Sequence, residues 1–272
     1  MGEIVKGEKC GVCPHGCVFT EENPTGRCRA RGLGNPGYGL CTGLSVDPIE
    51  KKPLRRFKSG TKVLSTGPNG CNLSCLHCQN WHISQQYSET SRYIPPAELA
   101  SLAMSRSDGL AFTYTEPVIW YEYIMDTAPL VKEQGGFTVM VSNGYVNQSP
   151  LRDLTCVTDG WNIDLKAFSE KFYRDVCGGD LKTVKNSIAT VAASRCHLEL
   201  TWLLIPGMND SEDEVTKAAK WIAETAGAGT PLHVSRYFPR YRMDIAATTL
   251  PLLHRTVALF KEHLEDVIPG NI

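Results

Sequence analysis

The sequence lacks a charge imbalance, a long apolar run and a low-complexity tract. Its 272 residues carry 28 Lys and Arg against 29 Asp and Glu, so the formal net charge is −1. This near balance excludes a chain-wide electrostatic footprint for nucleic acid. No run approaches the roughly 18 consecutive apolar residues of a membrane span, and the first nine residues lack the apolar stretch of a signal peptide. We therefore expect a cytoplasmic globular protein with neither a membrane nor a nucleic acid as partner.

Cysteine is abundant and unevenly distributed. The chain has 11 cysteines, which are too few for the disulfide scaffold of a short secreted protein. Eight of them precede residue 79. Without a secretory signal, such a group indicates metal ligation or redox chemistry rather than disulfides. Cys156, Cys177 and Cys196 are scattered, and we expect them to be small buried hydrophobic residues.

Strand-like and helix-like segments alternate from about residue 61. Short segments rich in β-branched or aromatic residues predict buried parallel strands, and the segments between them predict helices. Six such repeats predict an α/β fold with a partial (β/α)6 TIM-like barrel over residues 59–272, and an open doubly wound sheet is the alternative. The predicted strands are 61–67, 109–115, 137–143, 160–166, 197–205 and 231–237, and the predicted helices are 95–105, 117–134, 170–194, 211–225 and 249–264.

Residues 1–58 differ in character from the rest of the chain. They are rich in glycine, cysteine and turn residues and show no clear period, so we predict a small Cys-rich N-terminal module. The module ends in a basic run, KKPLRRFK at 51–58. A solvated connector is the simpler interpretation of this run.

The most informative motif directly follows the first predicted barrel strand. Cys71, Cys75 and Cys78 have the spacing Cys-x3-Cys-x2-Cys, which allows three thiolates to converge on one metal centre. A [4Fe–4S] cluster is usually held by four cysteines, so three would leave one iron open for a small molecule. The alternative is a structural zinc site completed by His77 or His82, although the spacing differs from that of ordinary zinc motifs.

This motif resembles that of the radical S-adenosylmethionine (radical SAM) superfamily. More narrowly, the chain resembles the radical SAM enzyme of the AmmeMemoRadiSam system, which is related to pyruvate formate-lyase activating enzymes. The similarity runs in order from about residue 10 to residue 271. The segments that carry it are DPIEKKP (47–53), GCNLSCLHCQNW (70–81), ISQ (83–85), TYTEP (113–117), SNGY (142–145), DLK (164–166), LIPGMND (204–210) and PLHVSR (231–236).

The resemblance implies a cofactor pair and a reaction. Cys71, Cys75 and Cys78 would hold three irons of a [4Fe–4S] cluster, and SAM would chelate the fourth through its amino and carboxylate groups. One electron from a reductant protein such as ferredoxin or flavodoxin would cleave SAM to methionine and a 5′-deoxyadenosyl radical. That radical would abstract a hydrogen atom from a substrate, while the protein positions the reactants and excludes water and oxygen.

The resemblance also implies roles for polar residues at the predicted strand ends, where the ligands of barrel proteins collect. Glu116 follows the second strand and is expected to accept a hydrogen bond from the SAM ammonium. The alternative, which can hold at the same time, is a favourable charge at the start of the helix that begins with Pro117. Ser142 and Asn143 end the third strand and are expected to bind the ribose or the SAM carboxylate, although Ser-Asn-Gly is also an ordinary turn.

Three further residues complete the expected SAM site. Asp164 and Lys166 are two residues apart and share one face of a strand, which suits the ribose hydroxyls and the SAM carboxylate. A structural ion pair is the alternative for these two. His77 precedes Cys78, where relatives often carry an aromatic residue near adenine, and an imidazole can stack there too. His233 is a weaker candidate, because a hydrogen-bonded core histidine is the more common case.

Four more cysteines lie within nineteen residues near the N-terminus. Cys10, Cys13, Cys17 and Cys28 are enough for a closed site, which would hold either zinc or an auxiliary iron–sulfur cluster. Cys41 is close enough in sequence to join them. The alternatives are free thiols or a redox-active pair, Cys10 and Cys13, as in a thiol oxidoreductase.

The leading functional hypothesis is a radical SAM enzyme that acts on an unidentified substrate. One specific version is a glycyl-radical enzyme activase acting on a partner protein, and another is a modifying role beside Memo-like and AMMECR-like partners. Relatives usually continue past residue 271 into a tail with a further Cys-x2-Cys pair. The alternative from another class is a zinc-binding adaptor or RNA-binding module that uses residues 10–28 as a knuckle and 51–58 on phosphate.

Overall fold

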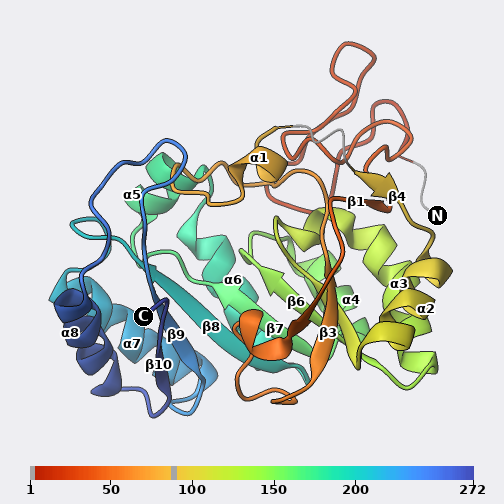
Figure 1. The fold of residues 1–272 in the computed structure, drawn as a ribbon. Helices are drawn as coiled ribbons and strands as arrows, with labels where there is room; N and C mark the ends of the chain where they lie inside the picture. The colour runs from red at the N-terminus through yellow and green to blue at the C-terminus, as the bar shows by residue number, and fades with distance from the viewer. Residues whose placement is uncertain (1–3, 87–90) are drawn as a thin grey trace.

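The centre of the molecule is one eight-stranded sheet (Figure 1). The computed structural model describes residues 4–86 and 91–272. The sheet has the order β10-β9-β8-β7-β6-β5-β3-β2, and every neighbouring pair is parallel except β2 and β3. Its strands are β2 Ser45–Pro48, β3 Lys62–Thr66, β5 Gly109–Phe112, β6 Phe137–Ser142, β7 Gly160–Asp164, β8 His197–Leu204, β9 Leu232–Arg236 and β10 Val267–Gly270.

The strand order decides between the two predicted architectures. The six predicted strands, β3 and β5 to β9, all form and lie side by side in chain order. A doubly wound sheet reverses its strand order at a switch point, whereas a barrel adds strands sequentially. The α/β prediction is therefore confirmed, the doubly wound alternative is wrong, and the sequential order is that of a partial barrel.

Helices cover the outer face of the curved sheet (Figure 1). Neighbouring helices pack against one another in chain order, from α2 to α8. The long helices are α2 Pro96–Arg106, α3 Tyr121–Glu133, α4 Gln148–Val157, α6 Leu181–Ala192, α7 Glu212–Ala226 and α8 Leu250–Lys261. The short ones are η1 Ile49–Lys51, α1 Trp81–Ser84, η2 Pro117–Trp120, α5 Glu170–Phe172 and the π-helix η3 Tyr173–Cys177.

Besides the short strands β1 (Leu40–Cys41) and β4 (Arg92–Tyr93) and the short helices η1 and α1, one long helix and two strands of the main sheet were absent from the sequence prediction. Helix α4 begins with Gln-Ser-Pro, which reads as a turn, yet proline is tolerated in the first turn of a helix. Strands β2 and β10 are the edges of the sheet, and each contains a proline, which an edge strand can accommodate. Neither has the apolar run that identifies a buried central strand.

The basic run at 51–58 is not simply a solvated connector, which corrects the prediction. Leu54 is fully buried and packs with Ile49, Val63, Phe137 and Val139 against the inner side of β3, β5 and β6. Its charged neighbours largely stay at the surface. The segment therefore closes one end of the barrel interior (orange in Figure 1), where its apolar side chains replace water.

The cysteine-rich segment, residues 4–39, lies at the opposite end of the sheet (Figure 1). Its described backbone contains two isolated antiparallel bridges, Lys9 with Val18 and Thr25 with Gly32. The two-residue strands β1 Leu40–Cys41 and β4 Arg92–Tyr93 pair next to it. The predicted division at residue 58 stays a prediction, since β2 precedes it and is hydrogen bonded to β3. No described helix is long and apolar enough to span a membrane.

Candidate radical SAM site

The three cysteines of the central motif lie on one loop above the carboxyl ends of the strands. We call residues 67–85, which follow β3 and include α1, the cysteine loop. Its middle is held against η3, because Ser74 N donates to Cys177 O (2.8 Å) and Leu76 N donates to Val176 O (3.0 Å). A π-helix of this kind is rare and often marks a functional site. The tertiary structure thus fixes the backbone between Cys71 and Cys78.

The chemistry of these three thiols fits a cationic metal centre. Burial raises the pKa of Cys71 and of Cys78, and the charges of the neighbouring thiolates raise both further. A hydrogen bond from Cys177 lowers the pKa of Cys75. Three thiols that are buried or partly buried and repel one another as anions are stable as thiolates only beside a positive charge, which bound iron would supply. Within residues 4–86 and 91–272, no group of three or more His, Cys, Asp or Glu side chains is arranged to hold a metal ion, so binding at either group of cysteines would require their side chains to turn toward the metal.

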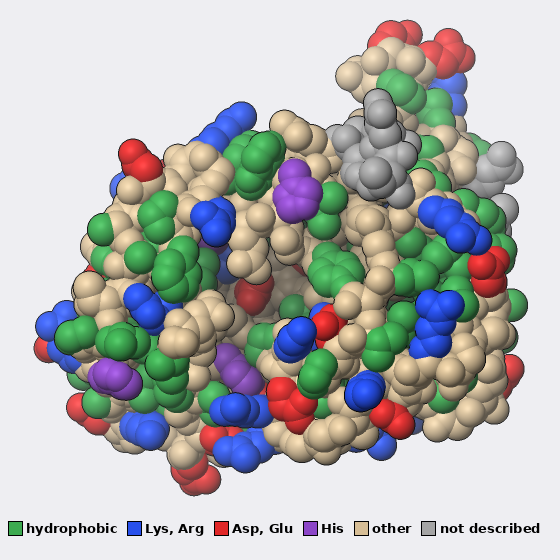
Figure 2. All heavy atoms as spheres, in the orientation of Figure 1, with side chains coloured by type: hydrophobic (Ala, Val, Ile, Leu, Met, Phe, Trp, Pro, Cys, Tyr) green, Lys and Arg blue, Asp and Glu red, His purple; other side chains and the backbone are tan. Residues whose placement is uncertain are grey.

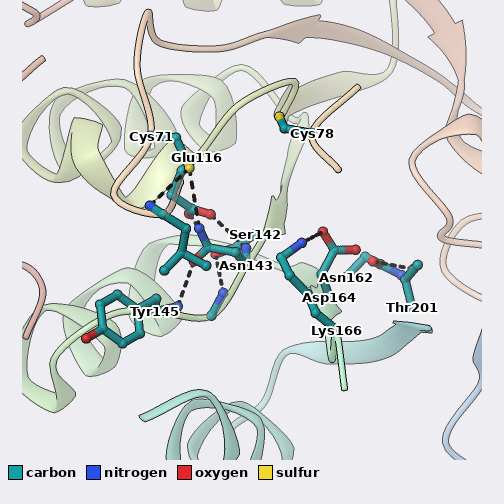
Figure 3. Close-up of polar contacts among 12 residues, drawn as sticks. Cys71, Cys78, Glu116, Ser142, Asn143, Tyr145, Asn162, Asp164, Lys166 and Thr201 are labelled. Atoms are coloured by element: carbon teal, nitrogen blue, oxygen red, sulfur yellow. Dashed lines mark hydrogen bonds and ion pairs between the residues drawn. The ribbon is translucent and has the colours of Figure 1, made fainter. Parts of the chain in front are cut away.

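Glu116 is the central polar residue of the site (Figure 3). Its side chain is fully buried and accepts hydrogen bonds from Val118 N (3.1 Å), Ser142 Oγ (2.8 Å) and Asn143 N (2.7 Å). The bond from Val118 caps η2, so the helix-start interpretation is confirmed. Burial raises the pKa of Glu116 to about 7 although these bonds favour the anion. No described Lys, Arg or His side chain forms an ion pair with this carboxylate, which leaves it able to bind an external cation.

Asn143 connects the strand ends to the cysteine loop (Figure 3). Its Nδ2 donates to Asn72 Oδ1 (2.9 Å) and lies 3.6 Å from Cys71 Sγ, while its Oδ1 accepts from Tyr145 N (2.8 Å). The turn that the sequence predicted at Ser-Asn-Gly is therefore also a structural bridge. Ser142, Asn143, Glu116 and Cys71 form one connected group of hydrogen bonds.

Asp164 and Lys166 lie on the next strand end and face each other (Figure 3). Their side chains form an ion pair of 3.0 Å, as the structural alternative expected. Burial opposes the charge of Lys166, but the negative charges of Asp164, Cys75 and Cys177 raise its pKa well above the ordinary value. The ammonium therefore lies within the electrostatic field of the cysteine loop.

His77 is brought into the same region. It is buried, its ring centroid lies 6.0 Å from that of Phe172, and its Nδ1 has no hydrogen-bond partner among the described residues. Burial lowers its pKa to about 3, so the imidazole is neutral. Figure 2 shows a hollow in the middle of this face with acidic and histidine side chains around it. The site thus combines buried polar groups with an opening to solvent.

Two residues of the site escaped the sequence analysis. Cys177 is fully buried, as predicted, but it is hydrogen bonded to Cys75 rather than being an inert hydrophobic residue. The same prediction is confirmed for the buried Cys196 and is wrong for Cys156, which is exposed. Asn72 is fully buried, and its Nδ2 donates to Tyr145 O (2.6 Å). The sequence could have indicated Asn72, because it is a polar residue between two proposed ligands. It could not have indicated Cys177, which is about a hundred residues from Cys75.

A second buried carboxylate lies within β8 at the other end of the barrel. Glu199 accepts from the backbone N–H groups of Arg55 (3.0 Å) and Arg56 (2.7 Å) and from the rings of His197 (3.0 Å) and His233 (2.6 Å). Burial disfavours its charge, but these bonds lower its pKa to about 2. His233 is thus a hydrogen-bonded core histidine, as the more common case predicted.

The four N-terminal cysteines share one polar pattern, because each sulfur accepts an N–H hydrogen bond. The donors are Arg31 Nε for Cys10 (3.3 Å), His15 N for Cys13, Arg27 N for Cys17 (3.4 Å) and Arg31 N for Cys28 (3.4 Å). Burial and, to a smaller extent, the negative charges of the other three thiolates raise the pKa of Cys13 to about 12. Cys41 lies apart, against Thr66 and Tyr123, so the structure does not bring it into this group.

Among solved structures, this fold is similar to a domain of pyruvate-formate lyase-activating enzyme from Bacteroides vulgatus, with a TM-score of 0.53 and 16% identity over 60% of this chain and 99% of that one. It is also similar to SuiB of Streptococcus suis bound to S-adenosylmethionine, with a TM-score of 0.60 and 12% identity over 75% of this chain and 48% of that one.

Comparison of the sequence with known proteins identifies the family. The chain is 36% identical to the uncharacterized protein MJ0808 of Methanocaldococcus jannaschii over 97% of this chain and 81% of that protein. It is 23% identical to the pyruvate formate-lyase-activating enzyme of Clostridium pasteurianum over 56% of this chain and 66% of that enzyme. The model of the radical SAM superfamily matches residues 66–222, from the end of β3 to within α7. The chain therefore belongs to the radical SAM superfamily.

Proposed function

We propose that this radical SAM enzyme holds its [4Fe–4S] cluster on Cys71, Cys75 and Cys78 and binds SAM on the adjacent strand ends. The cluster and SAM are the cofactors that the family implies. The observation that carries the proposal is the hydrogen-bonded path from Cys71 through Asn143 to Glu116, a buried carboxylate with no cationic partner in the described chain. A group that binds both the cluster and Glu116 must carry a cation, and SAM has an ammonium.

Glu116 is the proposed acceptor for that ammonium. Its two oxygens offer about four lone-pair sites, and three are used by Val118, Ser142 and Asn143, so one stays free. A charge-assisted bond in a buried setting is about twice as strong as a neutral one. Ser142 and Asn143 hold this carboxylate in place, and we assign them to the ribose or carboxylate of SAM through their remaining donors.

Asp164, Lys166 and His77 are the proposed contacts for the rest of SAM. Lys166 is positively charged beside the cysteine loop and suits the SAM carboxylate, while Asp164 can accept from ribose hydroxyls. His77 is neutral and buried, and its unpaired Nδ1 can accept a hydrogen bond from an adenine amino group. Together the three would align the sulfonium with the cluster.

Held by Cys71, Cys75 and Cys78, a reduced cluster would supply the electron for cleavage of SAM to methionine and a 5′-deoxyadenosyl radical, which would abstract a hydrogen atom from substrate. The chain's own residues bind and orient SAM and keep water out of the interior. The radical SAM superfamily membership makes the adaptor and RNA-binding alternative unnecessary.

The finer assignments are also proposals. We propose that the enzyme belongs to the AmmeMemoRadiSam system, because the eight ordered segments from 47 to 236 match that family and not only the cluster motif. Memo-like and AMMECR-like proteins would then be partners, and ferredoxin or flavodoxin would supply the electron. Activation of a glycyl-radical enzyme is the second candidate, favoured by the similarity to pyruvate formate-lyase-activating enzyme. We also propose a second metal centre, zinc or an auxiliary iron–sulfur cluster, on the four N-terminal cysteines.

The test is SAM cleavage by protein reconstituted with iron and sulfide without oxygen. With dithionite and SAM, the wild type should form 5′-deoxyadenosine. Cys75→Ala should abolish it and lose the cluster iron, whereas Cys177→Ala removes only a hydrogen-bond partner and should retain iron. Metal counting and 5′-deoxyadenosine chromatography report both. Equal iron loss in the two variants would mean that the ligand assignment is wrong, and zinc in place of iron would overturn the enzymatic proposal.

A further inference from the structure

The cysteine-rich segment has only a small apolar core of its own, although Arg31 pairs with Glu122 and Asn147 is hydrogen bonded to Gly11. Among its described residues, regular pairing is limited to the two isolated bridges. Its buried apolar side chains, besides cysteines, are Ile4, Val12, Phe19 and Ala30. A segment of this size with so small a core usually needs a disulfide or a bound metal as a staple. All four cysteines are free thiols, so a bound metal, rather than a disulfide, would stabilise the segment.

The four sulfurs share an N–H donor pattern that suits metal-bound thiolates, although burial raises the pKa of Cys13 and of Cys28 and keeps both as thiols until a cation binds. An N–H group donates to each sulfur, and one donor is the guanidinium of Arg31, whose charge is also balanced by Glu122. A neutral thiol is a weak acceptor, whereas a thiolate is the form that binds metal. Four neighbouring thiolates, of which Cys13 and Cys28 are buried, require a cation among them, for the same reason as in the cysteine loop.

The cysteine-rich segment touches the cysteine loop through residues next to its own cysteines. His15, two residues after Cys13, donates from Nε2 to Asn72 O (2.8 Å). Arg27, directly before Cys28, donates to Ser74 Oγ (3.4 Å). The contacts to the loop therefore come from backbone positions that a metal at the four thiolates would fix.

Arg29, the residue after Cys28, also contacts the cysteine loop. Arg29 donates to Ser84 O (3.1 Å) and to Gln85 Oε1 (3.2 Å). Cys28 O lies so near Gly70 that a Cβ there would be 2.1 Å from it, and Gly70 has φ +117°. Any other residue at position 70 would separate the two segments, so the close approach depends on glycine.

These contacts reach all three cysteines of the loop. Gly70 and Asn72 flank Cys71, and Ser74 precedes Cys75. Ser84 Oγ lies 3.2 Å from Cys78 Sγ. Each proposed ligand of the SAM cluster thus has a neighbour held by the cysteine-rich segment.

We propose that Cys10, Cys13, Cys17 and Cys28 bind a four-thiolate metal centre, and that this centre clamps the cysteine loop in the shape that receives the SAM cluster. Its role in the clamp rests on the proposed function of Cys71, Cys75 and Cys78. The same four thiolates suit one zinc ion or one iron–sulfur cluster.

The metal is tested in a variant that lacks the loop cysteines, with Cys71, Cys75 and Cys78 all replaced by alanine. Incubated with Zn2+ or reconstituted with Fe2+ and sulfide, it should bind either one zinc or one chromophoric cluster per chain. Metal counting and visible and EPR spectra separate these two supporting outcomes. A chain that binds neither metal overturns the proposal, and it does so without reference to SAM cleavage.

The clamp is tested by hydrogen exchange of residues 70–85 in the full chain. Cys13→Ala with Cys28→Ala should lose the N-terminal metal and speed exchange there by about tenfold or more, whereas the exposed Cys156→Ala should change neither. His15→Ala keeps all ligands, so it should retain the metal and still speed exchange by about threefold at residues 71–74. Metal loss with unchanged exchange in the double variant, or unchanged exchange in His15→Ala, overturns the clamp.

Discussion

Glu116 and Glu199 are both fully buried glutamates of one barrel, yet their environments push their pKa values in opposite directions. Glu116 lies beyond the carboxyl end of β5, where burial raises its pKa to about 7. Glu199 lies near the start of β8, where burial is outweighed by bonds from two histidines and two backbone N–H groups, and its pKa falls to about 2. The partners, rather than the depth of burial, therefore decide whether a carboxylate is charged.

The difference separates a structural group from a binding group. Glu199 ties β8 and β9 to the segment at 53–58 that closes the barrel, and all its partners belong to the chain. Glu116 is oriented by three donors but forms no ion pair with a Lys, Arg or His side chain in the part of the chain that the structure describes. A buried carboxylate whose charge the protein leaves uncompensated indicates a site that a ligand completes. The variants below test this contrast by changing one glutamate at a time.

Glu199→Gln should have the largest effect on stability. It removes a buried charge that is hydrogen bonded to both imidazoles, so the free energy of unfolding should fall by about 3 kcal/mol. The depressed pKa implies that the contribution of Glu199 is present above its ordinary pKa and is lost as the pH falls toward 2. Urea unfolding at neutral pH measures it, with the exposed Glu212→Gln as control. A change below about 0.5 kcal/mol would contradict the structural role.

Glu116→Gln should instead affect SAM binding. Loss of the charge-assisted contact should weaken binding by about 1.5–3 kcal/mol, while the free energy of unfolding changes less than in Glu199→Gln. Isothermal titration of SAM into the reconstituted protein measures the Kd. If Glu116→Gln binds SAM as tightly as the wild type, the ammonium assignment is wrong.

The raised pKa of Glu116 predicts a pH dependence of SAM affinity. The carboxyl is neutral below about pH 7 and negative above it, and only the anion attracts an ammonium. SAM affinity of the wild type should therefore rise by about tenfold between about pH 6 and about pH 8, and Glu116→Gln should show no such rise. A flat profile in the wild type would show that this carboxyl does not titrate in that range.

The smallest expected effect concerns His197 and His233, the two histidines that are hydrogen bonded to Glu199. His233 is buried and lies 2.6 Å from the carboxylate, whereas His197 is partly exposed and lies 3.0 Å away. His197→Ala should lower the free energy of unfolding by about 1 kcal/mol, and His233→Ala by more. Urea unfolding of both variants gives the order, and a larger loss for His197→Ala would reverse the proposed ranking.

Local pattern was sufficient to predict most of the fold. The six central strands are apolar and bounded by turns, so their positions follow from the sequence, and β8 has its predicted start. Helix α4 and the edge strands β2 and β10 escaped, because a proline or a polar start hid them. The segment at 51–58 was misjudged, since its few apolar residues are buried only after the barrel curves around them.

The sequence alone determined the residues of the cysteine motif, the strand-end polar groups and the alternation of strands and helices, because each depends on spacing or period within a short window. The tertiary structure decided which of these residues meet. It brought Cys177 to Cys75 and Asn143 to Cys71. It also shifted the pKa of Glu116 upward and that of Glu199 downward. These facts depend on burial and on partners distant in the chain, and no local spacing encodes them.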